Sequence, residues 1–295
     1  MLQAVKHLSA ALILALLPAL VPLVAAVQAA GPIRVGVCLD ADKFEAAQAA
    51  GFDYVEINAS RVAALTDAEF QSLAARVAQM RIPVEAANVF IPGAIKLTGP
   101  DVDPARQAAH LELTLGRLER LGVKVVVLGS GGARRVPDGF SRDEAWAQLV
   151  DFCRRLAPIA RAHGVTIAIE PLRRQETNII NTAREGLALV RAVDRPEIQL
   201  LVDYYHMAEE GESADILLEA GKAVVHTHVA NPKGRVYPLD AAESDYGPFF
   251  ENLCKIGYAG RLSIEASTKD FAADAPIALA MLRKGLACGT GKKEK

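Results

Sequence analysis

The chain has 295 residues, with 33 Lys and Arg against 35 Asp and Glu, and a formal net charge of −2. This balance argues against bulk nucleic-acid binding by positive charge, because polyphosphates attract basic surfaces. Hydrophobic residues make up 51 % of the chain and charged residues 23 %, which excludes intrinsic disorder and predicts a globular core.

The N-terminal segment has the layout of a secretory signal peptide. Lys6 and His7 precede an apolar run from residue 10 to residue 27, and Val27 and Ala29 occupy the −3 and −1 positions of a cleavage after Ala29. We therefore expect residues 1–29 to be removed and the mature protein to be periplasmic or extracellular, without stable membrane association. Two alternatives stay open: an uncleaved membrane anchor, or a misassigned start codon and a cytoplasmic protein.

Eight short runs rich in β-branched residues alternate with eight helical patterns along the rest of the chain. The strands are predicted at 33–39, 54–58, 84–89, 123–128, 165–170, 198–203, 224–229 and 261–265. The helices are predicted at 41–50, 67–80, 104–121, 142–163, 183–193, 214–220, 246–256 and 272–286. Thr66, Ser141 and Thr182 each stand three residues before a glutamate, which is typical of a capping box at a helix start.

Eight β-α units in this length predict one α/β domain, a single (β/α)8 TIM barrel over residues 30–288. No G-x-G-x-x-G follows the first strand, which disfavours an open dinucleotide-binding sheet. No linker divides the barrel, and the Gly- and Lys-rich residues 289–295 are predicted to form a flexible tail.

The chain contains four cysteines that are widely separated in the sequence. Cys38, Cys153, Cys254 and Cys288 form no C-x-x-C pair, so neither a thiolate zinc site nor a disulfide framework is indicated. We expect all four to be packed or idle thiols.

Four consecutive predicted strands end on a carboxylate or an imidazole. Alternate residues of a barrel strand point inward, and the loops after the strands build the active site of this fold. By this alternation the inward residues at these ends are Glu170, Asp203, His228 and Glu265. Three carboxylates in a partly dry mouth repel one another, and a divalent cation removes that cost. Ligands without sulfur favour Mn²⁺, with Mg²⁺, Co²⁺ or Zn²⁺ as alternatives.

Pairing of these carboxylates with loop arginines is the alternative to a metal. His226 lies one layer deeper than His228, so we expect it to fill the barrel or to support the metal ligands. Glu56, Asn88 and Phe90 follow strands two and three and are predicted to line the substrate pocket.

A glycine-rich loop follows strand four. Residues 129–135 read Gly-Ser-Gly-Gly-Ala-Arg-Arg, and their backbone N–H groups with two guanidinium groups could cradle a phosphate or carboxylate. The candidate anion-binding residues are Ser130, Arg134 and Arg135, and a loop with solvated arginines is the alternative.

Four motifs at the strand ends resemble those of a known family. They are Ile169-Glu170-Pro171-Leu172, Val202-Asp203-Tyr204-Tyr205-His206-Met207, His226-Thr227-His228-Val229-Ala230 and Ser263-Ile264-Glu265. The chain resembles the sugar phosphate isomerase/epimerase family of the xylose-isomerase-like TIM barrel superfamily. The resemblance spans the chain after the leader and is strongest over residues 165–267. It implies the same four metal ligands, and it implies substrate contacts at Glu176, His206 and Arg235. Arg235 falls one residue later than the corresponding epimerase arginine.

The expected activity is that of a metal-dependent isomerase or epimerase of a sugar or related hydroxy-ketone, acting through an enediolate. Glu170 and Glu265 come from opposite ends of the four-strand arc and are predicted to form the acid/base pair. A dehydratase of keto-sugars or inososes and a non-catalytic exported sugar-binding protein remain alternatives, and a homo-oligomer is left open. An abasic-site nuclease ranks last, because the extra ligands of endonuclease IV relatives are missing after strands three, four and seven.

Overall fold

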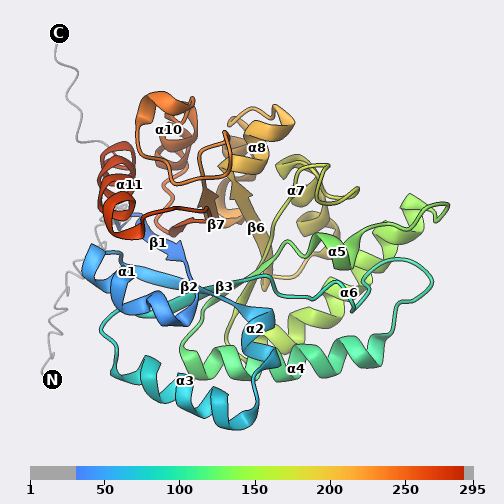
Figure 1. Ribbon diagram of the computed structural model, residues 1–295. Coiled ribbons are helices and arrows are strands. Elements are labelled where there is room, and N and C mark those ends of the chain that lie inside the picture. Colours follow the sequence, from blue (N-terminus) through green and yellow to red (C-terminus); the bar gives the residue numbers. More distant parts are fainter. Residues whose placement is uncertain (1–30, 289–295) are drawn as a thin grey trace, which may run out of the picture.

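The computed structural model describes residues 31–288, and these form a closed parallel barrel with β1 to β8 in sequential order (Figure 1). The strands are β1 (Arg34–Cys38), β2 (Tyr54–Asn58), β3 (Val84–Asn88), β4 (Val125–Leu128), β5 (Thr166–Ile169), β6 (Ile198–Asp203), β7 (Val224–Val229) and β8 (Arg261–Ile264). Strand β8 pairs with β1, which closes the barrel. The predicted fold class is therefore confirmed, whereas the predicted signal peptide and tail lie outside the described residues.

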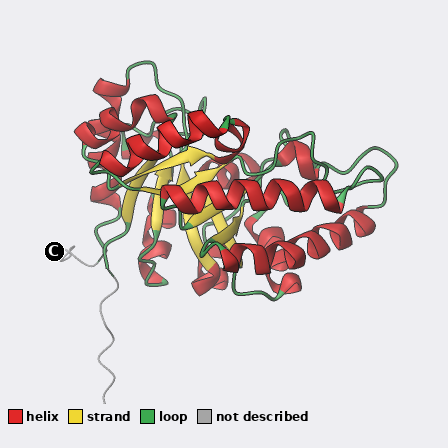
Figure 2. Cartoon of the chain, turned by 90° about the horizontal axis from the view of Figure 1, so that it is seen from below, coloured by secondary structure: helices red, strands yellow, loops and turns green. Residues whose placement is uncertain are grey.

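Helices surround the strands on the outside of the barrel (Figure 2). They are α1 (Phe44–Ala50), α2 (Ala59–Ala64), α3 (Asp67–Gln79), α4 (Pro104–Leu121), α5 (Gly131–Arg134), α6 (Arg142–Ala162), α7 (Ala183–Val193), α8 (Tyr204–Glu210), α9 (Ile216–Ala220), α10 (Gly247–Lys255) and α11 (Phe271–Gly285). Short 3₁₀ turns are η1 (Ala41–Lys43), η2 (Gly221–Ala223) and η3 (Ala241–Glu243). None of the helices in residues 31–288 combines the length and apolar character needed to cross a membrane.

All eight predicted helices are present, and α2, α5 and α8 are additional. Two of the three begin on the last residue of a strand: the Asn58 and Asp203 side chains accept backbone N–H bonds as the N-caps of α2 and α8. Asn58 and Asp203 were predicted as strand ends, and the structure confirms this. The side chain of each also caps the helix that follows, and this helix was not predicted.

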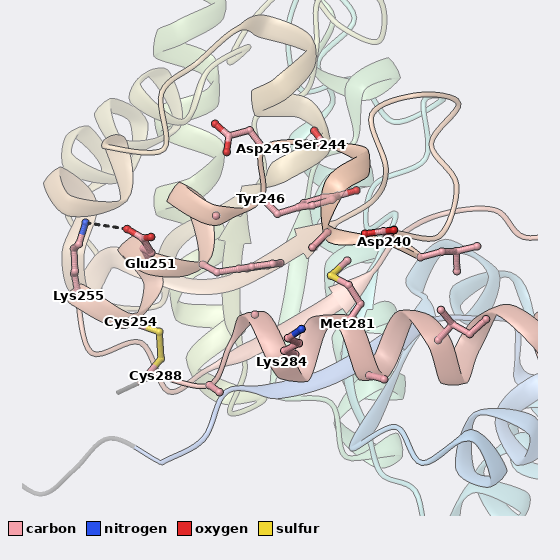
Figure 3. Close-up of a pocket in the computed structure, with 18 residues that line it drawn as sticks. Asp240, Ser244, Asp245, Tyr246, Glu251, Cys254, Lys255, Met281, Lys284 and Cys288 are labelled. Atoms are coloured by element: carbon pink, nitrogen blue, oxygen red, sulfur yellow. Dashed lines mark ion pairs between the residues drawn. A yellow bond between two sulfur atoms is a disulfide. The ribbon is translucent and has the colours of Figure 1, made fainter. Parts of the chain in front are cut away.

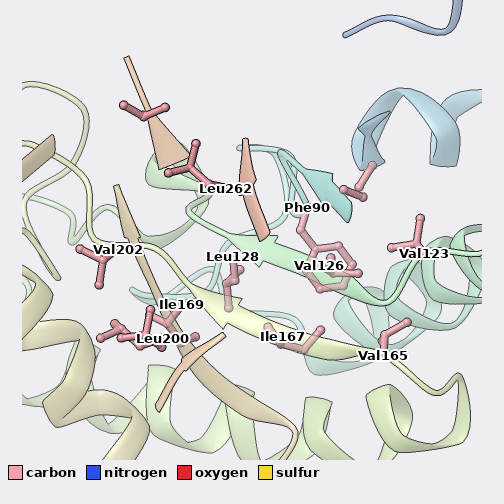
Figure 4. Close-up of a cluster of buried hydrophobic side chains, with 14 of the residues drawn as sticks. Phe90, Val123, Val126, Leu128, Val165, Ile167, Ile169, Leu200, Val202 and Leu262 are labelled. Carbon is pink, nitrogen blue, oxygen red and sulfur yellow. The ribbon is translucent and has the colours of Figure 1, made fainter. Parts of the chain in front are cut away.

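Two apolar clusters separate the inside of the barrel from its helical coat. The outer cluster holds Val165, Ile167 and Ile169 of β5, and Figure 4 shows it extending over neighbouring strands. The inner cluster holds Tyr54, Ala86, Val125, Val127, Ala168 and Leu201. The predicted alternation of β5 and β6 is thus confirmed, and it puts their last polar residues at the mouth.

The barrel interior is filled and sealed below the mouth. Gly36 provides space for the ring of Tyr54, because a Cβ at Gly36 would lie 2.3 Å from Tyr54 Cζ. At the N-terminal ends of the strands, the Glu85 carboxylate pairs with Arg34 and with Arg261, the latter at 2.7 Å. Polar chemistry is therefore left to the C-terminal mouth.

One sequence-based expectation about the cysteines is wrong. Cys254 at the end of α10 and Cys288 after α11 form a disulfide, while Cys38 and Cys153 are free thiols. The two bonded residues are 34 positions apart, so only the packing of α10 beside α11 brings them together. No spacing in the sequence reports that contact.

Candidate functional site

The four predicted strand-end residues converge at the mouth of the barrel. One donor atom from each of Glu170, Asp203, His228 and Glu265 lies within 4.8 Å of the others. His228 Nδ1 is 3.1 Å from Glu170 Oε1 and 3.6 Å from Glu265 Oε2. Glu170, Asp203 and His228 are buried, and Glu265 is partly exposed to the mouth. We call these four residues the strand-end cluster.

The donors of the strand-end cluster fit a divalent cation. Asp203 Oδ1 accepts a hydrogen bond from the Tyr205 backbone N–H at 2.8 Å, but Asp203 Oδ2 is buried without any hydrogen-bond partner. A buried carboxylate oxygen without a partner is costly unless a cation or ligand completes it. Three carboxylates and one imidazole, without sulfur, match the preferences of Mn²⁺ and related ions.

The pKa shifts in the cluster reflect burial of like charges. Burial raises the pKa of Asp203 to about 7, and burial together with the charge of Glu265 raises the pKa of Glu170. Burial alone would lower the pKa of His228, but the carboxylates of Glu56 and Glu265 outweigh it and raise that pKa well above its usual range. Without a cation, the cluster therefore retains protons that a cation would displace.

Glu56 supports the cluster from below and also borders a cavity beside it, so its contact with substrate stays a prediction. Its Oε1 lies 3.1 Å from His228 Nε2, and its Oε2 lies 2.8 Å from His226 Nε2. Ser263 Oγ donates to the same Oε2 at 2.6 Å, so both oxygens are already used. Glu56 fixes the imidazole of His228 with Nδ1 towards the cluster, which is a common arrangement around metal-binding histidines. His226 contacts the same Glu56 carboxylate, which agrees with the prediction that His226 supports the metal ligands.

Gly129 at the end of β4 leaves room for the Glu170 carboxylate. A Cβ at Gly129 would lie 2.2 Å from Glu170 Oε2, so the Glu170 carboxylate would have to shift from its present position. The glycine in this loop therefore serves the position of Glu170.

Beside the cluster, an ion-pair network contains two of the predicted substrate residues. Arg235 pairs with Glu265 Oε2, and its Nη1 lies 3.2 Å from Glu176 Oε1. Arg173 Nε reaches the same Glu176 oxygen at 3.0 Å. Both guanidinium groups lie over the Tyr205 ring, whose centroid is 4.7 Å from Arg235 Cζ and 5.0 Å from Arg173 Cζ. The structure thus brings Glu176 and Arg235 to the mouth.

His206 presents a single N–H donor towards the cluster. Its Nδ1 accepts from the Arg173 backbone N–H at 3.1 Å, so the proton of the neutral ring is on Nε2. Nε2 is buried, has no hydrogen-bond partner, and lies 3.6 Å from Asp203 Oδ2. Burial and the nearby charge of Arg235 lower the pKa of His206 to about 3, which keeps the ring neutral. This geometry suits a hydrogen bond to a substrate oxygen.

Strand β3 contributes Asn88 to the site but not Phe90. Asn88 Nδ2 donates to Glu265 Oε1 at 2.7 Å, whereas Phe90 is buried in the outer apolar cluster. Val89 between them has a φ of +51°, which interrupts the inward–outward alternation. The prediction that Phe90 lines the pocket is therefore wrong.

The glycine-rich loop after β4 does not form the predicted cradle. Arg134 is buried, and its guanidinium donates to the carbonyl oxygens of Leu128 and Ile180, each at 3.2 Å. Ser130 Oγ accepts from the Ile91 backbone N–H at 2.9 Å, and Arg135 is exposed. Ser130 and Arg134 therefore tie neighbouring segments together instead of facing a shared anion, while the role of Arg135 stays a prediction.

Two cavities near the C-terminal half of the chain differ in their relation to the cluster. A cavity of about 470 Å³ is bordered by Cys38, Glu56 and Asn88, the last two in direct contact with cluster residues. A cavity of about 950 Å³ lies between α10 and α11 beside the disulfide (Figure 3). Of the two, only the smaller cavity is lined by residues that contact the cluster, so it, and not the larger one, is the candidate pocket for a ligand of the cluster.

Sequence reasoning missed Arg173 and Tyr205, and it did not foresee that Glu56 supports His228. Tyr205 was visible within the Asp203–His206 motif, and Arg173 stands three residues before Glu176, a spacing that allows the observed pair. The contact of Glu56 with the histidines of β7 could have been anticipated by extending the strand alternation to β2, where Glu56 faces inward as they do.

Comparison with known proteins supports the same assignment of the fold. The family model described as xylose isomerase-like TIM barrel matches residues 44–285. L-ribulose 3-epimerase of Methylomonas sp. is 35 % identical over 166 residues, which cover 56 % of this chain and 55 % of that protein. L-ribulose 3-epimerase of Mesorhizobium japonicum is 28 % identical, and the match covers 75 % of this chain and 73 % of that protein. The solved structure of a Methylomonas D-allulose 3-epimerase has a TM-score of 0.77 at 26 % identity, and covers 87 % of this chain and 99 % of that chain.

Proposed function

This chain belongs to the xylose isomerase-like TIM barrel family, as its motifs predicted, and from that premise we propose that it is a divalent-metal-dependent epimerase or isomerase of a ketose sugar. The observation that carries the proposal is the buried strand-end cluster, with one donor from each of four residues within 4.8 Å. The names of the two relatives, both L-ribulose 3-epimerases, favour epimerisation of a ketose over the other reactions of the superfamily.

In this proposal Glu170, Asp203, His228 and Glu265 hold the cation, with Mn²⁺ as the favoured ion. A bound cation would polarise the substrate carbonyl and stabilise the negative charge that develops on its oxygen. Glu170 and Glu265 act on the carbon next to the carbonyl: one carboxylate accepts its proton, and the other returns a proton to the opposite face. Their positions on either side of His228 Nδ1 support this division of work.

The residues around the cluster orient the sugar. His206 Nε2–H is the donor for a substrate oxygen near Asp203, because it has no partner within the described residues. Arg235 and Glu176 supply one donor and one acceptor for neighbouring hydroxyl groups, and their mutual contact at 3.2 Å fixes both. Asn88 holds Glu265 from the other side at 2.7 Å.

Proton exchange in D₂O tests the proposal. The metal-loaded protein is incubated with L-ribulose, D-psicose and other ketoses, and deuterium incorporation next to the carbonyl is followed by NMR. We expect incorporation for at least one sugar, and loss of it in Glu170→Gln and Glu265→Gln, with Glu112→Gln on the outer face of α4 as control. Exchange at the wild-type rate in Glu170→Gln would refute the role of that residue.

Two other functions give different results in the same experiment. A keto-sugar dehydratase would exchange the proton and then lose water, so the product would be two hydrogens and one oxygen lighter. A non-catalytic binding protein would bind sugar more tightly with metal but would incorporate no deuterium into any ketose.

We also propose that the mature chain works outside the cytoplasm. The Cys254–Cys288 disulfide supports this location, because disulfides persist in oxidising compartments. The signal-peptide pattern of residues 1–29 agrees with it. Mass spectrometry of the protein from its native compartment tests the location: a chain that begins at Ala30 supports it, and an intact N-terminus in the cytosolic fraction contradicts it.

A further inference from the structure

The cavity of about 470 Å³ lies beside the strand-end cluster and is lined by residues of β1, β2 and β3 and of the loop after β8. Its inner wall includes Cys38 at the end of β1 and Asn88, whose amide contacts Glu265. Its volume lies within the range of about 300–1,000 Å³ that is usual for small-molecule sites. The cavity thus adjoins the cluster through Asn88 and Glu56, and it offers room for the far end of a sugar bound at the cluster.

The outer wall of this cavity carries an excess of positive charge. Lys43, Arg61 and Lys269 line the cavity, together with the carboxylates of Asp40 and, deeper in the barrel, Glu56. Asp40 is already paired with Arg61. Within residues 31–288, neither Lys43 nor Lys269 is in an ion pair, so their two ammonium groups are not neutralised by the protein.

The opposite side of the cluster is different. Arg235 and Arg173 both contact Glu176, Arg235 also contacts Glu265, and Arg173 pairs with Glu209 at 2.9 Å. Every guanidinium there has a carboxylate partner. The two guanidinium groups next to the cluster are thus paired, whereas Lys43 and Lys269 of the distal cavity, the end of the site lined by β1, β2 and the loop after β8, are in no ion pair within residues 31–288.

A neutral donor accompanies the two lysines. The Asn58 Oδ1 accepts from the Arg61 backbone N–H at 2.9 Å, which leaves the amide Nδ2 of Asn58 as a donor facing no acceptor in the described chain. Asn58 lines the same cavity. Two ammonium groups and an amide donor form a set that recognises an anion through charge-assisted hydrogen bonds.

Resting on the proposed function, we propose that the distal cavity is a subsite for an anionic group carried by the ketose at the carbon remote from the metal. The group is a carboxylate or a phosphate, and Lys43 and Lys269 are its principal partners. The preferred substrate is then a keto-sugar acid or a ketose phosphate rather than a neutral ketose. A sugar acid agrees better with a location outside the cytoplasm.

Matched pairs of sugars that differ only at carbon six test the subsite. The neutral sugars are D-fructose and D-tagatose, and their partners are the corresponding 6-carboxylates (D-fructuronate and D-tagaturonate) and 6-phosphates. Deuterium exchange gives kcat and KM, and calorimetry gives the affinity of the metal-loaded protein for each sugar. We expect KM for an anionic sugar to be lower by about tenfold or more than for its neutral partner, because hydrogen bonds to charged groups are strong. Comparison of the two anions identifies which group the subsite takes.

The double variant Lys43→Ala/Lys269→Ala isolates the charge. It should raise KM for the anionic sugar by about tenfold, without changing kcat or the KM of the neutral partner by more than about twofold. Because both side chains are exposed, the circular dichroism and melting temperature should stay as in wild type. Lys222→Ala, an exposed lysine at the other end of the barrel, is the control and should change none of these values.

The outcomes separate this inference from the proposed function. If ketoses exchange deuterium but the anionic and neutral partners have equal KM and affinity, the anionic subsite is refuted and the epimerase proposal stands. If affinity for the anion is higher but the double variant retains it, the assignment to Lys43 and Lys269 is refuted. If anions bind through the lysines but no sugar exchanges deuterium, the subsite stands and the proposed function fails.

Discussion

Replacement of Gly129 by alanine tests the position of Glu170 without substituting any of the four proposed ligands of the cation. The new Cβ would lie 2.2 Å from Glu170 Oε2 and 3.3 Å from Glu170 Cδ. Contacts between such a carbon and an oxygen settle at about 3.3 Å, so the carboxylate must move by roughly 1 Å. A displacement of about 1 Å at a reacting group costs on the order of 100-fold in rate. We therefore expect Gly129→Ala to lower kcat by about that factor.

The assay is the rate of deuterium exchange into a ketose, with metal affinity and melting temperature measured on the same preparation. Gly132→Ala in the same loop is the matched control, because its Cβ would meet nothing closer than 3.7 Å. The control should keep wild-type activity. If Gly129→Ala also keeps full activity and metal affinity while the protein stays folded, the assignment of Glu170 to the reaction is wrong.

Three further predictions follow from the same contacts. Glu56→Gln should weaken metal binding by about 10–100-fold while the protein stays folded, because it removes a carboxylate that supports His228. An unchanged metal affinity in a titration of the metal-free protein would contradict this. Because the pKa values of Asp203 and His228 are raised in the metal-free protein, protons should leave when the metal binds, and the affinity for the metal should rise with pH from about 6 to 8. Calorimetry in buffers of different ionisation enthalpy measures this proton release. A binding heat that does not depend on the buffer would contradict it. Reduction of the Cys254–Cys288 disulfide should lower the free energy of unfolding by about 3–4 kcal/mol. It should leave kcat unchanged, since no cluster residue borders the cavity beside the disulfide. Denaturant titration and activity assays with and without reductant check both values, and a fall in kcat would show that the disulfide affects the active site.

The barrel and the strand-end cluster could be predicted because both depend on local periodicity. Alternation along β5 to β8 fixes which residues point inward, and the parallel sheet then brings the last inward residues together. Nothing beyond the sequence of each strand was needed to place Glu170, Asp203, His228 and Glu265 around one point.

The errors concern features that depend on tertiary contacts or on one unusual dihedral angle. The positive φ of Val89 turned Phe90 out of the pocket, and a β-branched residue gives no local signal for that conformation. Arg134 was expected in solvent or on an anion, but backbone carbonyls of two other segments accept its hydrogen bonds. The Cys254–Cys288 bond likewise depends on how two helices pack.

The contacts of Glu56 were not predicted. Its place in β2 indicated the barrel mouth, and the structure adds partners from β7 and β8, which are not neighbours of β2 in the sheet. Residues from distant strands meet there because the barrel closes, and the sequence does not state which inward residues touch. The distinction between binding substrate and supporting a ligand depends on that contact.

The central claim is that Glu170, Asp203, His228 and Glu265 together bind one divalent cation. A crystal structure of the protein grown with Mn²⁺, with anomalous scattering recorded at the manganese edge, tests it most directly. We expect one anomalous peak per chain, with His228 Nδ1 and an oxygen of each carboxylate within about 2.0–2.3 Å of it. An empty cluster in crystals that hold Mn²⁺ elsewhere, or a peak bound by other residues, would contradict the account.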